Sequence, residues 1–117
     1  MKVLYLAHKI RDQGLWQHQQ NIRAAEAVAL TLWQAGAAII CPGKNTEFFD
    51  GAAEDDTWLN GDLEILKRCD AIIMGPFWRE SVGARREREE AIVASKPVFF
   101  WPEDKQAIWN FIKDIKL

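Results

Sequence analysis

Residues 2–7 read KVLYLA, a short apolar run that ends at the polar stretch 8–13. The run predicts a first β-strand. Three more runs of the same kind, at residues 37–40, 70–74 (DAIIM) and 97–101 (PVFFW), predict three further strands. Their continuous apolar character is typical of strands that are covered on both faces of a sheet.

Between and after these strands the apolar spacing predicts helices at residues 21–35, 57–69, 82–95 and 103–115, while the polar stretch 44–54 is expected to be a loop. Strands that alternate with helices pair in parallel. We therefore expect one domain over residues 1–117. Its fold class is α/β: a three-layer, flavodoxin/Rossmann-like parallel sheet of about four to five strands with helices on both faces. Ligands of such sheets bind beyond the carboxyl ends of the strands.

The composition excludes several classes of protein. The 117 residues include 15 Lys plus Arg and 17 Asp plus Glu, a formal net charge of −2. This charge argues against a partner that is a nucleic-acid polymer. No apolar stretch has the length of a membrane span and no signal peptide is apparent, so a cytoplasmic protein is expected. Two His and two Cys give no metal-ligand pattern, so neither a metal nor another cofactor is expected. The six tryptophans are many for so short a chain, and some should line a pocket or an interface.

Two carboxylates are predicted to face the protein interior. Glu87 shares a helical face with the small residues Ala84, Ala91 and Ala94 near the ligand edge of the sheet. An inward carboxylate is unfavourable unless it has partners or a function. The alternative is a different helical phase that leaves Glu87 in water.

Asp62 has the same property, because Trp58, Ile65 and Cys69 fall on its helical face. It caps a loop or pairs with an arginine in the alternative interpretation. The adjacent Gly61 weakens the helix, so we expect another group to approach closely there. Two carboxylates at one cleft can divide roles in cleavage of a glycosidic bond, one as an ionised nucleophile and one as a partly protonated acid.

Four segments resemble the nucleoside 2-deoxyribosyltransferase superfamily: Tyr5–Ala7, Gly61–Leu63, Cys69–Ile73 and Ser81–Glu87. The most similar members are short proteins of uncharacterised function. The resemblance implies that Glu87 attacks C1′ of the sugar and forms a glycosyl-enzyme intermediate. It also implies that Asp62 is the acid/base residue and that Tyr5 lies beside the catalytic glutamate. Taken alone, Tyr5 is equally compatible with a core strand residue.

The Ser-x-Gly-x-x-x-Glu pattern at Ser81 and Gly83 is similar to that of the 2′-deoxynucleoside 5′-phosphate N-hydrolases. True deoxyribosyltransferases have an aspartate in place of the serine, and serine with helix N-terminal amides accepts a phosphate instead. The same resemblance implies a phosphate-binding loop at Lys9, Ile10 and Arg11. As a pattern by itself, this stretch is also compatible with a solvated loop.

Three further residues are expected on the base side of the pocket. His8 would line it or hydrogen-bond a substrate group. Trp78 would stack on a nucleobase or pack at a subunit interface. Asn45 lies on a loop that would form a lid over the base or dock on a neighbouring subunit.

Together these features predict an enzyme that cleaves the N-glycosidic bond of a (deoxy)nucleoside 5′-monophosphate, with water or a second base resolving the intermediate. A non-catalytic nucleotide-binding or sensing module on the same fold is the alternative, and a cleft for another phosphorylated metabolite is a third. We also expect a homodimer or a higher homo-oligomer. The apolar residues that point to it lie on the last predicted helix and at two exposed-looking tryptophans: Ile108, Trp109, Phe111, Ile112, Ile115, Trp16 and Trp33.

Overall fold

Four parallel strands form the centre of the molecule. A computed structural model describes residues 1–114, and its strands are β1 (Val3–Ala7), β2 (Ala38–Ile40), β3 (Ala71–Met74) and β4 (Val98–Phe100). Their order in the sheet is β2-β1-β3-β4, with Tyr5 of β1 opposite Ile40 on one side and Ile72 on the other. The α/β fold class with a four-strand parallel sheet is therefore confirmed.

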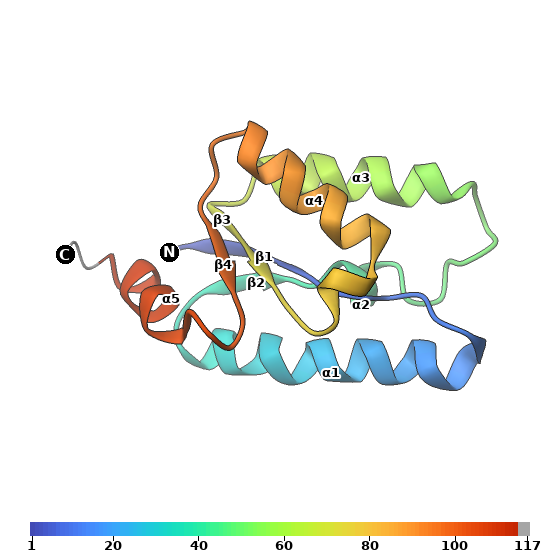
Figure 1. The fold of residues 1–117 in the computed structure, drawn as a ribbon, viewed down its shortest axis with the longest axis horizontal. Coiled ribbons are helices and arrows are strands. Elements are labelled where there is room, and N and C mark those ends of the chain that lie inside the picture. Colours follow the sequence, from blue (N-terminus) through green and yellow to red (C-terminus); the bar gives the residue numbers. More distant parts are fainter. Residues whose placement is uncertain (115–117) are drawn as a thin grey trace.

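Helices cover both faces of this sheet (Figure 1). Helices α1 (Gly14–Gln34) and α5 (Lys105–Ile112) pack on one face, around Leu4 and Leu6 of β1. Helices α3 (Asp55–Lys67) and α4 (Val82–Val93) pack on the other face, around Tyr5 and Ala7. This division follows from the alternation of side chains along a strand. None of the helices within residues 1–114 is long and apolar enough to cross a membrane.

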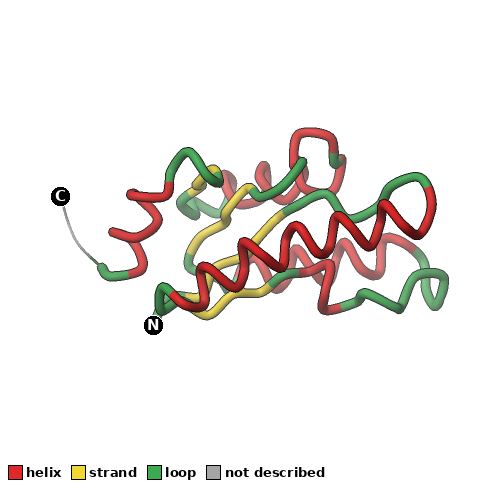
Figure 2. The backbone as a smooth tube through the Cα atoms, turned by 90° about the horizontal axis from the view of Figure 1, so that it is seen from below, coloured by secondary structure: helices red, strands yellow, loops and turns green. Residues whose placement is uncertain are grey.

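Helix α1 is longer than the sequence pattern predicts, because it begins at Gly14 rather than at residue 21. Figure 2 shows it running along the sheet as the longest helix. Its buried residues begin at Asn21, and Leu15 and Trp16 in the first turn are 76% and 75% exposed. The first two turns of α1 lack an apolar stripe because they do not pack on the sheet. The apolar periodicity therefore predicts only the part of the helix that packs on it.

The short helix α2 (Pro42–Asn45) overlaps the start of the stretch 44–54, which is expected to be a loop. It begins with a proline in the first turn, where no amide donor is needed. A 3-10 turn, η1 (Trp78–Glu80), precedes α4. Beside Asp62 on α3, a side-chain carbon added at Gly61 would meet nothing within 4 Å. No group within residues 1–114 therefore makes the expected close approach at Gly61, which is exposed.

Helix α5 contributes less exposed apolar surface than expected. Ile108 is buried, and Trp109, Phe111 and Ile112 pack against the core formed with α1. Ile115 lies outside the described residues. The apolar excess of this helix is thus largely used within the chain, and the exposed residues that remain for an interface include Trp16 and Trp33, the latter 52% exposed.

Candidate active site

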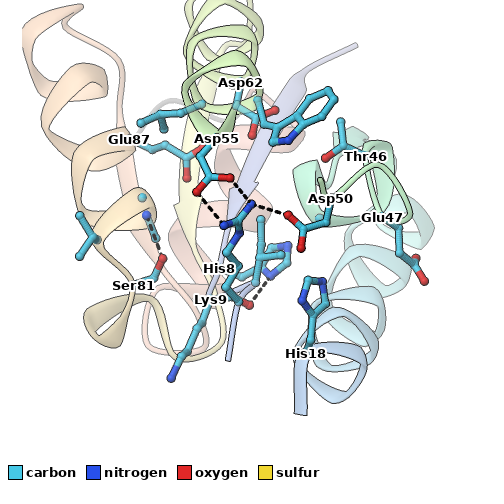
Figure 3. Close-up of a pocket in the computed structure, with 18 of the residues that line it drawn as sticks. His8, Lys9, His18, Thr46, Glu47, Asp50, Asp55, Asp62, Ser81 and Glu87 are labelled. Carbon is cyan, nitrogen blue, oxygen red and sulfur yellow. Dashed lines mark hydrogen bonds and ion pairs between the residues drawn. The ribbon is translucent and has the colours of Figure 1, made fainter. Parts of the chain in front are cut away.

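A cleft of about 500 Å³ opens beyond the carboxyl ends of β1 and β3. This is the point where the chain order in the sheet reverses direction, because β1 is followed by β2 on one side and by β3 on the other. The loop after β1, the segment after α2, the first half of α3 and the start of α4 line the cleft (Figure 3).

Glu87 lies at the bottom of this cleft, in the second turn of α4, and is only 5% exposed. The hydroxyl of Tyr5, on the central strand β1, donates a hydrogen bond to Oε2 of Glu87. Tyr5 is fully buried, so strand and helix fix the position of this carboxyl group together. Ala84 and Ala91 share the buried face of α4, as its helical phase predicts, whereas Ala94 caps the helix and is exposed.

Asp62 reaches the same cleft from α3, on the other side from Glu87 (Figure 3). It is 9% exposed, and neither a loop cap nor an arginine partner for it is found within residues 1–114. Both inward carboxylates therefore meet in one cavity, from two different helices.

Burial raises the pKa of both carboxyl groups. Desolvation raises the pKa of Glu87 to about 8, with a smaller contribution from the charge of Asp62, while the Tyr5 hydrogen bond lowers it. Desolvation alone raises the pKa of Asp62 to about 6. The pKa of Glu87 is thus higher than that of Asp62, which is opposite to the expected order, because Glu87 is the more deeply buried group. Between these two values the pair holds one proton.

The expected phosphate-binding cations are held by carboxylates. Arg11 donates from Nη1 and Nη2 to both oxygens of Asp55, at 2.9 and 2.8 Å, and from Nη2 to Asp50 at 2.8 Å. The Nζ of Lys9 lies 3.2 Å from Asp12 and 3.9 Å from Glu80. Lys9, Ile10 and Arg11 all line the cleft, but neither cation is free there, because the surrounding loops supply acidic partners close to each.

The start of α4 also faces the cleft. The Ser81 hydroxyl accepts the amide of Ala84 at 3.1 Å and caps the helix. Val82 and Gly83 line the cleft, and their amides are in the first turn, where a helix supplies no internal acceptor. A side-chain carbon added at Gly83 would meet only the Ser81 oxygen, at 3.9 Å, so there is open space beside this turn.

His8 lines the cleft with its ring rather than with a free nitrogen. It is 1% exposed, and burial lowers its pKa, so the neutral form is favoured. Its Nδ1 lies 2.9 Å from the carbonyl oxygen of Lys9 and its Nε2 lies 3.5 Å from Sγ of Cys41. With Nδ1 donating to that carbonyl, Nε2 accepts from the thiol. Both nitrogens thus have partners in the protein, and of its two expected roles His8 has the position for lining the pocket.

Two expected base-side residues lie outside the cleft. Asn45, at the end of α2, lines a second hollow of about 710 Å³ beside α1 and the edge strand β2. Trp78 packs on Phe100 of β4, with ring centroids 5.6 Å apart, and the guanidinium of Arg79 lies 4.9 Å from its ring. Trp78 is half-buried and packs against the core between α4 and the sheet.

The cleft contains residues that the sequence patterns did not single out. These are His18 on α1 and Asp50, Asp55 and Asp56 before and in the first turn of α3. Thr46 after α2 also lines the cleft, and it lies with Asn45 on the loop that is expected to cover the base or dock on a neighbouring subunit. Thr46 and Asp50 follow β2 within the segment 42–50, where the strand-end rule places ligand contacts. His18 sits on the part of α1 that the periodicity does not report, so no sequence signal identifies it.

Comparisons with known proteins agree with this architecture. A family model described as "Domain of unknown function (DUF4406)" matches residues 2–100. The 2-deoxyribosyltransferase of Bacillus psychrosaccharolyticus is similar in structure with a TM-score of 0.59 and 19% identity, over 84% of this chain and 70% of that chain. A 2-desoxiribosyltransferase from Leishmania mexicana has a TM-score of 0.60 and 16% identity, over 86% of this chain and 63% of that chain. At these identities the likeness establishes the fold. No curated protein matches the sequence.

Proposed function

This chain belongs to the DUF4406 family, and from its cleft we propose that it cleaves the N-glycosidic bond of a nucleoside or nucleoside 5′-monophosphate. The observation that carries this proposal is the buried pair of carboxyl groups, Glu87 with its Tyr5 hydrogen bond and Asp62 opposite, at the switch point of the sheet. The 2-deoxyribosyltransferases that share the fold act as a second support.

In the proposed reaction a carboxylate oxygen of Glu87 attacks C1′ as the C1′–N bond breaks, and the electron pair of that bond goes to the base nitrogen. Asp62 gives its proton to the departing base. Water or a second base then attacks C1′, the C1′–O bond to Glu87 breaks, and the Glu87 carboxylate is restored. The ionised Asp62 takes the proton from the attacking water in hydrolysis, or from the attacking nitrogen of the second base in transfer. Tyr5 stabilises the ionised Glu87 by its hydrogen bond.

The shared proton makes this mechanism depend on pH in a definite way. Attack needs an ionised Glu87 and a protonated Asp62, so the pair must hold one proton in total. Between about pH 6 and pH 8 the pair holds this one proton, mostly on Glu87, so the reactive form with the proton on Asp62 is a minor one. Its share falls below about pH 6, where both groups are protonated, and above about pH 8, where both are ionised. We therefore expect a bell-shaped rate profile with its maximum near neutral pH.

The finer proposal, that the substrate carries a 5′-phosphate, is supported by the Ser81 cap and by the first amides of α4, which line the cleft. A phosphate that reaches Arg11 must replace Asp50 or Asp55 as its partner. Asp55→Asn removes one of these charges, so it should raise the rate on a 5′-monophosphate relative to the matching nucleoside. An unchanged ratio of the two rates would show that Arg11 does not bind the phosphate.

The test of the function is a panel of nucleosides and 5′-monophosphates, ribose and deoxyribose, assayed for free base by chromatography. Glu87→Ala should abolish base release, and Asp62→Asn should lower it by about 10²- to 10⁴-fold. Glu89→Ala, on an exposed position of the same helix, is the matched control. Intact-protein mass spectrometry should detect a glycosyl adduct that the Glu87 variant lacks.

A non-catalytic nucleotide-binding module remains the second candidate. It is favoured by the raised pKa of Glu87, which keeps much of that group protonated near neutral pH in the free protein. Binding of panel members without release of base from any of them would support this candidate over the enzyme.

A further inference from the structure

The indole nitrogen of Trp58 is a buried hydrogen-bond donor that has no acceptor within residues 1–114. Trp58 ends the first turn of α3 and lines the cleft. Its ring packs against Phe49, with centroids 5.8 Å apart and an angle of 47° between the planes. The ring is therefore positioned by an aromatic neighbour, while its polar nitrogen is left without a partner.

Buried donors in folded proteins are almost always paired, because an unpaired one has lost its bonds to water without replacement. The nearby carboxylates of α3 do not serve as acceptors for Trp58: Asp55 is bound by Arg11, and neither Asp56 nor Asp62 accepts a hydrogen bond from the indole nitrogen. An unpaired donor in a cleft wall points to an acceptor that a ligand brings.

The position of Trp58 indicates which part of the ligand this is. Trp58 precedes Asp62 by four residues, so the two side chains lie on the same face of α3, one turn apart. In the proposed reaction Asp62 protonates the leaving base, so the base must lie against this face. Asp56 in the same turn forms no ion pair within residues 1–114, and its charge disfavours an anion such as a phosphate beside Trp58.

We propose that the indole N–H of Trp58 donates a hydrogen bond to an acceptor on the nucleobase, a carbonyl oxygen or a ring nitrogen, and so holds the leaving base beside Asp62. The identification of the ligand as a base rests on the proposed function. Trp58 is then a specificity-determining residue: an indole N–H only donates, so it selects bases that present an acceptor at this position and disfavours those that present an amino group.

The variant Trp58→Phe tests this directly, because phenylalanine keeps a ring against Phe49 and removes only the donor. No hydrogen bond of the free protein is lost, so the thermal midpoint should be unchanged or higher. The dissociation constant for a free base, and KM for the nucleoside, should rise about three- to tenfold. Trp78→Phe, at a tryptophan that packs on Phe100 outside the cleft, is the matched control and should leave the affinity unchanged.

Two further measurements separate a hydrogen bond from a packing effect. Analogues whose base lacks the acceptor, with carbon in place of the ring nitrogen or hydrogen in place of the carbonyl oxygen, should bind wild type and Trp58→Phe equally. In a proton–nitrogen NMR spectrum, the indole signal that disappears in Trp58→Phe should move downfield when the free base is added to wild type.

The outcomes for the base contact and for catalysis are distinguishable. A responding Trp58 signal without release of base from any substrate supports the contact and overturns the proposed enzyme. Release of base at the same KM by wild type and Trp58→Phe, with an unmoved indole signal, overturns the contact and leaves the proposed enzyme standing. An equal loss of affinity for the parent base and for the analogue without the acceptor also overturns it, because packing alone then explains the effect.

Discussion

Replacing Glu87 with glutamine should make the protein more stable, by an amount that depends on pH. Burial raises the pKa of Glu87 from its ordinary 4.5 to about 8. At pH 7 the unfolded chain therefore ionises this group while the folded chain mostly does not. Each pH unit between the two pKa values costs about 1.4 kcal/mol of folding stability. The accumulated cost is about 3 kcal/mol at pH 7 and about 5 kcal/mol above pH 8. Below pH 4.5 both states are protonated and the cost disappears.

Glu87→Gln keeps the size of the side chain and an oxygen that accepts from Tyr5, but it has no charge to desolvate. In urea or guanidinium titrations, the variant should match wild type near pH 4 and exceed it increasingly up to pH 8.5. Glu89→Gln, exposed on the same helix, should follow wild type to within about 0.5 kcal/mol at each pH. A constant difference between wild type and Glu87→Gln across this range would show that Glu87 is not desolvated as described.

Tyr5→Phe removes a hydrogen bond that favours the ionised Glu87. Base release should therefore slow, and the alkaline limb of its pH profile should move to higher pH. An unmoved limb would show that Tyr5 does not affect the pKa of Glu87. Gly43→Ala places a carbon 2.7 Å from Cε1 of His8 and should cost about 1–3 kcal/mol in denaturant titrations. Gly61→Ala, in open space, should instead stabilise the protein by about 0.5–1 kcal/mol. A destabilised Gly61→Ala together with a stabilised Gly43→Ala would contradict the surroundings described for both glycines. Light scattering at micromolar concentration should give a homodimer or larger mass, and a monomer would refute the oligomer.

The sequence predicts the sheet and its inward carboxylates because both follow from periodicity. The continuous apolar runs indicate strands that are buried on both faces. The spacing of Ala84, Glu87 and Ala91 indicates which side of α4 packs on the sheet. These are local patterns, and the helical phase is enough to place Glu87 and Asp62 inside. The start of α1 is missed for the same reason, since a helix that leaves the sheet has no stripe to detect.

Side-chain partners are not local, and there the sequence is a poor guide. Arg11 and Asp55 are 44 residues apart, yet they share two hydrogen bonds across the cleft. A basic residue after a strand therefore indicates a phosphate site only when no acid from another segment reaches it. Trp58 illustrates the opposite case: its proposed role depends on the absence of an acceptor for its indole nitrogen within residues 1–114, which no spacing in the sequence reveals.

The electrostatics of the cleft favour a ligand that develops positive charge during the reaction. Seven carboxyl side chains and two basic residues line it, and the deepest carboxyl group is the one whose charge is most disfavoured by burial. A sugar that becomes an oxocarbenium ion at C1′ places a positive charge against Glu87 exactly when that group must be ionised. The free energy lost by desolvating Glu87 in the free protein is then partly recovered in the transition state. Catalysis depends on such interactions, which are stronger in the transition state than in the ground state. A ligand that stays neutral does not use this stabilisation of charge. The burial of Glu87 therefore favours an enzyme where the group is ionised in the complex, and a binding module where it stays protonated.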